Sequence, residues 1–169
     1  MPITNATLAD VTELYKLINN AYRGEESKKG WTTEAYLIEG SRIEEYMLVD
    51  YLNNDAVTLL KYTSEDSRII GSVYLEIKGD ELYLGMFSVL PTLQNTGVGR
   101  ALIEEAEVIA KQLQLRTISM TVISSRKELI SWYQRRGYTF TCEIQPFHHD
   151  GRFGSPKEII ELINLEKQV

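Results

Sequence analysis

The segment from residue 81 to residue 123 constrains the fold most, because it joins two strands through a helix. Glu81–Val89 reads as a strand, and Pro91 closes it because proline cannot donate a ladder hydrogen bond. A helix is predicted over 98–113, where four apolar residues follow one stripe: Leu102, Ala106, Ile109 and Leu113. Thr117–Ile123 then reads as a second strand. This strand–helix–strand crossover indicates a mixed sheet.

Most of the other predicted strands are joined directly to one another. Strands are expected over 56–62, 68–77, 138–143 and near 159–165. The tight connection Lys78-Gly79-Asp80 links the second of these to the strand that starts at Glu81. A chain of 169 residues favours one domain, since domains usually span roughly 100–200 residues. Together these features predict a single α/β or α+β domain over 1–169.

Helices are expected mainly before the strands. Thr7 and Asp10 form a variant capping box, and apolar residues recur at helical spacing from there to Tyr22. A short helix is predicted over 31–40. Ser41 and Glu44 form a regular capping box, which predicts a further helix to about residue 52. One more helix is predicted over 126–136.

Composition limits the function. The net charge of −6 argues against a nucleic-acid binder, which should present a basic face. The only cysteine, Cys142, excludes an intrachain disulfide and fits a reducing compartment; its place in a predicted strand favours a buried, inert thiol. The N-terminus lacks a signal-peptide pattern, and no apolar run approaches the ~18 residues of a membrane span. We therefore expect a cytoplasmic protein without a membrane partner.

The loop between Gln94 and Arg100 carries the strongest chemical signal. Gly97 and Gly99 let the backbone turn sharply and approach a ligand closely. The helix that starts there leaves its first N–H groups unpaired and places its positive dipole end at the same point. A pyrophosphate satisfies both, and Arg100 can add a charge-assisted contact.

Spacing tests two other phosphate-binding motifs. A dinucleotide fingerprint requires a third glycine where Leu102 stands, and an acidic residue about 20 positions onward, where Ser119 and Met120 stand. A P-loop requires Gly-Lys-Ser/Thr, and the sequence has no such triplet. Both motifs are therefore excluded, which leaves either a purely geometric strand-to-helix turn or a different cofactor loop.

Two segments resemble a known family. The first is the strand end Leu84-Gly85-Met86-Phe87-Ser88-Val89-Leu90-Pro91, followed by Gln94-x-x-Gly97-x-Gly99. This segment is similar to the acetyl-CoA signature of the GNAT superfamily of N-acetyltransferases. The second is Trp132-Tyr133-Gln134-Arg135-Arg136-Gly137-Tyr138, which resembles the Tyr-x-x-x-Gly-Phe/Tyr segment of the same family. The resemblance covers residues 68–143 and implies a mixed, mostly antiparallel sheet of six or seven strands flanked by helices. It also implies acetyl-CoA as cosubstrate, with no metal.

The resemblance further implies roles for individual residues. Tyr133 would be the general acid that protonates the leaving thiolate. Backbone groups of Phe87 and Val89 would pair with the pantetheine arm. The pyrophosphate would be held by the loop, which consists of Gln94, Asn95, Thr96, Gly97, Val98, Gly99 and Arg100. The family often has an asparagine and an alanine where Arg126 and Leu129 stand here, so Ser124, Ser125 or Arg126 would take the asparagine's place.

The general base and the acceptor site are less defined. In some family members a glutamate projects from this strand, but the matching position here is Tyr83. Glu81 and Glu76 are therefore the candidate bases, and a water chain is the alternative. Residues 23–50 carry seven acidic and four basic side chains, which could attract an amine. Within this stretch Trp31, Glu34 and Arg42 are the candidate acceptor contacts. Phe147, His148, His149 and Asp150 form a second candidate patch, in which adjacent histidines disfavour a metal site.

Three functions stay open from the sequence. The first is an N-acetyltransferase that moves acetyl to a primary amine by direct attack in a ternary complex. The second is a non-catalytic acyl-CoA-binding module, and the third is an unrelated nucleotide-binding protein. The acceptor partner is a small-molecule or peptide amine, and the protein is expected to be a monomer or a homodimer.

Overall fold

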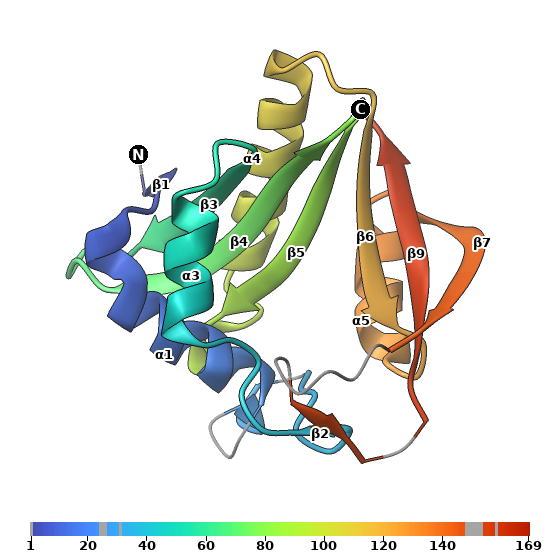
Figure 1. Ribbon diagram of the computed structural model, residues 1–169, viewed down its shortest axis with the longest axis horizontal. Coiled ribbons are helices and arrows are strands. Elements are labelled where there is room, and N and C mark those ends of the chain that lie inside the picture. The colour runs from blue at the N-terminus through green and yellow to red at the C-terminus, as the bar shows by residue number, and fades with distance from the viewer. Residues whose placement is uncertain (1, 24–26, 31, 148–153, 158) are drawn as a thin grey trace.

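A seven-stranded sheet forms the centre of the computed structural model, which describes residues 2–23, 27–30, 32–147, 154–157 and 159–169 (Figure 1). The strands lie in the order β1-β3-β4-β5-β6-β9-β7, and only the β5–β6 pair is parallel. Their bounds are β1 Ile3–Asn5, β3 Val57–Thr63, β4 Ile69–Lys78, β5 Glu81–Val89, β6 Thr117–Ile123, β7 Thr139–Pro146 and β9 Glu161–Gln168. This mixed, mostly antiparallel sheet confirms the predicted fold class.

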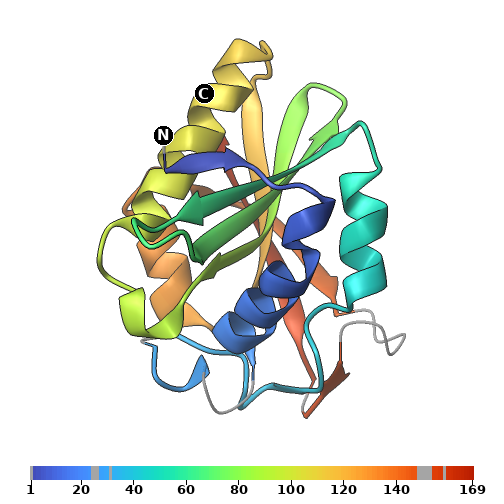
Figure 2. The same ribbon diagram turned by 90° about the vertical axis from the view of Figure 1, so that its left-hand side faces the viewer.

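Helices cover both faces of the sheet (Figure 2). The 3-10 turn η1 (Leu8–Asp10) leads into α1 (Val11–Tyr22), and α1 packs with α3 (Glu45–Leu52) on one face. On the other face lie α4 (Val98–Gln112) and α5 (Lys127–Gln134), which share the larger apolar core. The apolar stripe predicted for α4 is buried at Leu102 and Ala106, which have no exposed surface. The capping box of Thr7 and Asp10 is present at η1.

In the first third, the helix predicted over 31–40 is wrong, whereas the helix predicted from Ser41 to about residue 52 is present but starts later. Residue 31 lies outside the described residues, and 32–40 contain turns and the short strand β2 (Ile38–Glu39), which pairs with β8 (Ser155–Pro156). Helix α3 begins at Glu45, and its N-cap is Glu44 instead of Ser41. The reason is tertiary: Asn19 Oδ1 of α1 accepts the backbone N–H groups of Arg42 (2.7 Å) and Ile43 (3.1 Å). That contact pairs both N–H groups with a side chain of α1 and holds the segment in a non-helical conformation up to Glu44.

The sheet opens between β5 and β6 (Figure 1). These strands pair only from Glu81 to Tyr83 and from Thr117 to Ser119, after which they diverge. A register shift between β4 and β5 follows on β5, between Gly85 and Ser88, and Met86 within it adopts a φ of 44°. A bulge of this kind bends a strand and increases its twist. It thus turns the second half of β5 away from β6, and leaves the β5 edge at Phe87 without a strand partner on that side.

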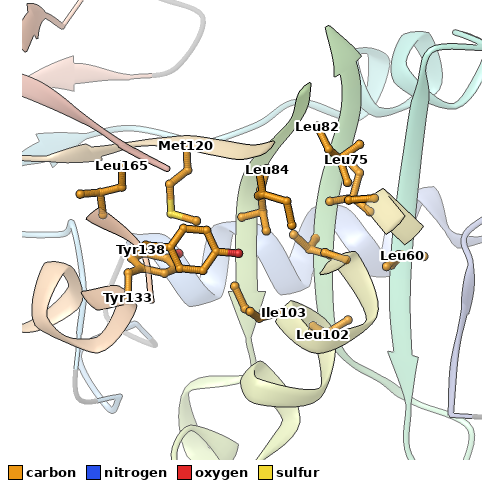
Figure 3. Packing of buried hydrophobic residues seen from close by; sticks show 14 of the residues in the cluster. Leu60, Leu75, Leu82, Leu84, Leu102, Ile103, Met120, Tyr133, Tyr138 and Leu165 are labelled. Atoms are coloured by element: carbon orange, nitrogen blue, oxygen red, sulfur yellow. The ribbon is translucent and has the colours of Figure 1, made fainter. Parts of the chain in front are cut away.

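Side chains fill part of this opening on the α4/α5 face. Figure 3 shows Met120 and Leu165 from β6 and β9, with Tyr133 and Tyr138, opposite Leu84 of β5 and Ile103 of α4. Tyr138 is only 1% exposed, so its ring belongs to the core that joins the two halves of the sheet. The opening is therefore closed by packing on this face.

Strand β7 forms the edge of the sheet beyond β9. Its pairing with β9 is interrupted between Phe140 and Ile144, and Cys142 within that bulge has a φ of 70° and an exposed side chain. The prediction of a buried thiol is therefore wrong, because the bulge turns this residue out of the sheet. Among the described residues, no helix is long and apolar enough to cross a membrane.

Candidate active site

The glycine loop connects β5 to α4 through a short 3-10 turn, η2 (Pro91–Leu93). The Thr96 hydroxyl donates to the carbonyl of Leu93, and Gln94 Nε2 donates to the carbonyl of Val89 at 3.4 Å. Asn95 and Gly97 both adopt positive φ angles, 66° and 95°. Asparagine and glycine tolerate this left-handed conformation best, so the local sequence matches the turn that the loop makes.

The start of α4 presents unpaired backbone donors. The N-cap Gly97 makes no side-chain cap, and the first helical hydrogen bond runs from Ala101 N–H to the Gly97 carbonyl at 3.0 Å. The amides of Val98, Gly99 and Arg100 therefore precede the first internal bond of the helix. A Cβ on Gly97 would meet no atom within 4 Å, which leaves open space on the loop side. The loop thus fits an anion such as a pyrophosphate.

Gly99 has a different reason to be glycine. A Cβ at this position would lie 2.9 Å from Cζ of Phe87 on β5. The absence of a side chain lets α4 begin directly against the splayed edge of β5. The pyrophosphate-type loop and the predicted pantetheine strand are thereby brought side by side.

A cavity of about 230 Å³, the loop cavity, lies between the glycine loop and α5. It gathers most of the predicted cofactor contacts, namely Phe87, Val89, Gln94, Asn95, Gly97, Gly99, Arg100 and Arg126. Val98 points into the core instead, where it is 6% exposed, and the Thr96 side chain does not line the cavity. The described lining includes three arginines and no carboxylate, which suits a phosphate-bearing ligand.

Arg136 is one of these arginines, and its position depends on Trp132. The guanidinium carbon lies 3.6 Å from the centroid of the Trp132 ring, and Nη1 donates to the Trp132 carbonyl at 2.9 Å. Trp132 lies in the last turn of α5, and Arg136 lies four residues later in the turn that follows the C-cap Arg135, which is still right-handed helical. Their stacking therefore follows from near-helical spacing. Sequence reasoning missed Arg136, although that spacing was the signal that could have found it.

Tyr133 lies at the centre of an aromatic group. Its ring centroid is 5.3 Å from that of Trp132, 5.9 Å from Tyr138 and 6.2 Å from Phe87. The side chain is 4% exposed, and burial raises the pKa of its phenol well above 10.0. The hydroxyl therefore keeps its proton over the whole neutral range, as a general acid requires.

A second cavity of about 510 Å³, the sheet cavity, lies between the diverging parts of β5 and β6. Five residues line both cavities: Tyr22, Phe87, Arg126, Leu129 and Tyr133. The two cavities therefore meet at Tyr133. Glu34 and Arg42, predicted as acceptor contacts, line the sheet cavity, as does Phe147. Trp31, His148, His149 and Asp150 lie outside the described residues.

The two candidate bases are placed differently. Glu76 lines the sheet cavity, where its Oε2 lies 3.2 Å from Nζ of Lys78. Glu81 lines neither cavity, because it sits where β5 and β6 are still paired. Of the two, the structure brings only Glu76 to the cavity that Tyr133 borders. Within the described part of the chain, no group of three or more His, Cys, Asp or Glu side chains is arranged to hold a metal ion.

A buried ion network supports the wall between the cavities. Oε2 of Glu34 accepts from Arg23 Nε at 3.1 Å, and Oε1 accepts from Arg126 Nη1 at 3.2 Å. Arg126 Nη2 also donates to Thr32 Oγ1 at 2.6 Å, and Arg23 Nη1 donates to the Ser41 carbonyl at 3.0 Å. Each of the three charged side chains is less than a tenth exposed. Both oxygens of Glu34 are thus engaged by arginines.

Tyr22 is the other residue that sequence reasoning missed. It ends α1 and lines both cavities, and burial raises the pKa of its phenol to about 12. The guanidinium carbon of Arg42 lies 5.3 Å from the centroid of its ring. In the sequence Tyr22 is one more residue of an apolar helix stripe, and no local signal separates it from the core.

Solved structures share the arrangement of the whole chain. The ribosomal-protein-S18-alanine N-acetyltransferase of Escherichia coli superposes with a TM-score of 0.72 at 16% identity, over 99% of this chain and 92% of that one. The PaiA N-acetyltransferase of Thermoplasma acidophilum, solved in complex with coenzyme A, gives 0.69 at 20% identity, over 99% and 98%. These identities establish a common fold and no more.

Sequence comparison supplies the family. The Bacillus subtilis (strain 168) protein YdhI is 30% identical over 79 residues, a match that spans about half of each protein, 47% of this chain and 48% of YdhI. The profile of the acetyltransferase (GNAT) family matches residues 11–138, which include the glycine loop, Tyr133 and the network around Glu34. Because that match covers about three quarters of the 169 residues, the chain belongs to the GNAT acetyltransferase family.

Proposed function

We propose that the protein is an N-acetyltransferase that moves the acetyl group of acetyl-CoA to a primary amine by direct attack in a ternary complex. The observation that carries this proposal is the position of Tyr133, which borders both the loop cavity and the sheet cavity. One cavity has the chemistry of a phosphate site, and the other is large enough for a small acceptor. A reaction between their two occupants would take place beside the phenol.

The loop cavity supplies the contacts for the donor. The first amides of α4 and the arginines at 100 and 136 would hold its phosphates. The edge of β5 beyond Tyr83, which has no strand partner on the β6 side, would offer its backbone at Phe87 and Val89 to the pantetheine amides. Acetyl-CoA supplies a thioester whose carbonyl carbon is open to attack by an amine.

The transfer moves one proton at each end. The acceptor nitrogen forms the new C–N bond and loses a proton, while the C–S bond breaks and its electron pair stays on sulfur. Tyr133 would give its phenolic proton to that sulfur as the C–S bond breaks, since its raised pKa keeps it protonated until then. The proton that the amine loses would pass to Glu76 or to a chain of water molecules, and Glu81 is the more remote candidate base.

The test is release of free thiol from acetyl-CoA against a broad panel of amines. Tyr133→Phe should lower kcat by roughly a hundredfold or more, the usual contribution of a positioned general acid, with almost unchanged acetyl-CoA affinity. Tyr46→Phe is the matched control, because Tyr46 is 58% exposed on α3 and lines neither cavity. Calorimetry measures the affinity in each variant.

Three outcomes separate the candidate functions. Acetyl-CoA binding without thiol release in the presence of any amine would favour a non-catalytic acyl-CoA-binding module. Stronger stabilisation by ADP or NAD than by CoA would favour an unrelated nucleotide-binding protein. Absence of acetyl-CoA binding at about 1 mM would refute both the enzyme and the binding module, because a Kd above that concentration means a binding free energy weaker than about 4 kcal/mol.

A further inference from the structure

Arg126 holds a buried positive charge where the two cavities meet. Its side chain is less than a tenth exposed and lines both the loop cavity and the sheet cavity, as Tyr133 does. Nη1 donates to Glu34 Oε1 at 3.2 Å, and Nη2 donates to Thr32 Oγ1 at 2.6 Å. These two contacts fix the guanidinium, and a guanidinium is always charged in a protein. The junction therefore carries a permanent, immobile cation.

The carboxylates that pair with Arg126 do not line the loop cavity. Glu34 Oε1 lies 3.2 Å from Nη1, and Glu128 Oε1 lies 4.0 Å from Nε. Glu34 lines only the sheet cavity and Glu128 lines neither, whereas Arg126 itself lines the loop cavity. These ion pairs are thus fixed dipoles whose positive end borders the cavity of the donor. Dipoles of this kind can stabilise a negative charge that develops beside them.

Helical spacing brings Arg126 and Tyr133 to the same side of α5. Arg126 is the N-cap of this helix, and Tyr133 follows about two turns later, with Leu129 between them. Helical side chains point back toward the N-terminus, so the Tyr133 ring leans toward Arg126. All three residues line both cavities.

The charge of Arg126 acts at the Tyr133 hydroxyl. Burial raises the pKa of this phenol most, and the phenols of Tyr22, Tyr138 and Tyr83 raise it further. Arg126 acts in the opposite direction, because a nearby cation favours the anionic form. A general acid lies within about 3 Å of the atom that it protonates, so the leaving sulfur would sit beside the same hydroxyl. A cation that favours negative charge on the phenol oxygen also favours it on that sulfur.

We propose that Arg126 stabilises the thiolate of the donor through its charge as the C–S bond breaks. This inference rests on the proposed function and adds a residue to it. In the step, the amine nitrogen forms the bond to the acetyl carbon, the C–S electron pair moves to sulfur, and Tyr133 supplies the proton that makes the thiol. Arg126 transfers no proton; it lowers the free energy of the state in which sulfur carries the negative charge.

The thiol of bound CoA reports this charge directly, because its thiolate absorbs ultraviolet light more strongly than the thiol. A pH titration of the protein–CoA complex gives the pKa of the bound thiol, and free CoA gives the reference. The same titration with desulfo-CoA, which lacks the thiol, subtracts the tyrosines and Cys142. The proteins are wild type, Arg126→Gln, Arg126→Lys and Arg68→Gln. Arg68 is the control, because it is exposed beside Asp66 and lines neither cavity.

In wild type the pKa of the bound thiol should lie about one unit or more below that of free CoA, since a nearby opposite charge shifts a pKa by about 1–3 units. Arg126→Gln should raise it again by about one unit and lower kcat by roughly tenfold. Arg126→Lys should keep much of the shift, and Arg68→Gln all of it. An unshifted thiol in wild type, or an unchanged pKa in Arg126→Gln, would overturn the inference.

The fold of Arg126→Gln is checked by circular dichroism. Its amide can still donate to Glu34, and Glu34 keeps its contact with Arg23 at 3.1 Å, so we expect the variant to fold. The wild-type titration needs no variant, and an unshifted thiol there is decisive by itself.

Thiol release from acetyl-CoA against the amine panel separates this inference from the proposed function. Transfer by wild type together with an unshifted thiol would overturn the role of Arg126 and leave the proposed function intact. A shift that is lost in Arg126→Gln, without transfer to any amine, would support the role of Arg126 and count against the proposed function. Absence of CoA binding would refute both.

Discussion

The buried bridge of Glu34 between Arg23 and Arg126 gives the sharpest stability prediction. Glu34→Gln keeps the shape of the side chain but removes its charge. The amide retains one oxygen for one arginine and turns an NH₂ group, itself a donor, toward the other. The two guanidinium groups then lose the buried counter-charge that they share. All three partners are less than a tenth exposed, so neither water nor salt screens them.

Breaking a buried ion pair by removing one partner costs about 3–5 kcal/mol. That is a large part of the roughly 5–15 kcal/mol by which a protein is usually stable. For a chain of this length each 1 kcal/mol lowers Tm by about 2–4 °C, so we expect a loss of roughly 6–20 °C.

Urea unfolding followed by circular dichroism measures the loss of unfolding free energy, and a thermal scan measures the drop in Tm. Glu104→Gln is the control, because Glu104 pairs with Arg100 at 2.7 Å through the same kind of contact, with side chains that are 58% and 70% exposed. This exposed pair should contribute nothing measurable. A Glu34→Gln variant within about 1 kcal/mol of wild type would show that the buried bridge does not need its charge, and would refute the reasoning.

Three further predictions follow from the loop, the phenol and the first helix. Gly97→Ala should lower the free energy of unfolding by about 1–2 kcal/mol, because the φ of 95° strains a residue that has a Cβ. The new Cβ would meet no atom within 4 Å, so the cost comes from the backbone alone. In urea titrations of both variants Gly97→Asn should cost less, and equal costs would contradict a backbone cause. Because the pKa of Tyr133 lies well above 10.0, kcat should show no loss from its ionisation up to about pH 10; a Tyr133-dependent fall near pH 8 would count against it as the acid. For Asp10, burial raises the pKa, but hydrogen bonds from Lys61 and Thr7 lower it below 3.8. A depressed pKa adds stability above the unfolded value, so Asp10→Asn should be less stable than wild type at pH 7; urea titrations should show the gap closing as pH falls below about 3.8, and a constant gap would disagree.

Local chemistry made much of the sheet predictable. Alternating apolar residues and a following proline predicted β5 with its bounds Glu81–Val89, and β6 with Thr117–Ile123. The start of α4 at Val98 followed from the glycine loop in which it lies. Side-chain period, missing N–H groups and positive φ angles all act within a few residues, so one sequence window contains their causes.

The first third was harder for the same reason. The backbone of Arg42 and Ile43 is held by Asn19, which lies more than 20 residues earlier, and that contact overrides the capping pattern of Ser41 and Glu44. Cys142 likewise occupies a strand that its local pattern predicts, but a bulge against β9 turns it outward. In both cases a partner distant in sequence decides the outcome.

By itself, then, the sequence determined most of the strands, the glycine loop and the family resemblance, because each depends on neighbouring residues. Only the tertiary structure decided what lies on the other side of Tyr133. The divergence of β5 from β6 opens the sheet cavity, and the fold brings Glu34 to Arg126, 92 residues away. The tertiary structure also gathers Arg42, Glu76 and Lys78 at one cavity wall, because the lining of a cavity depends on which side chains the fold brings there, whatever their order in the chain.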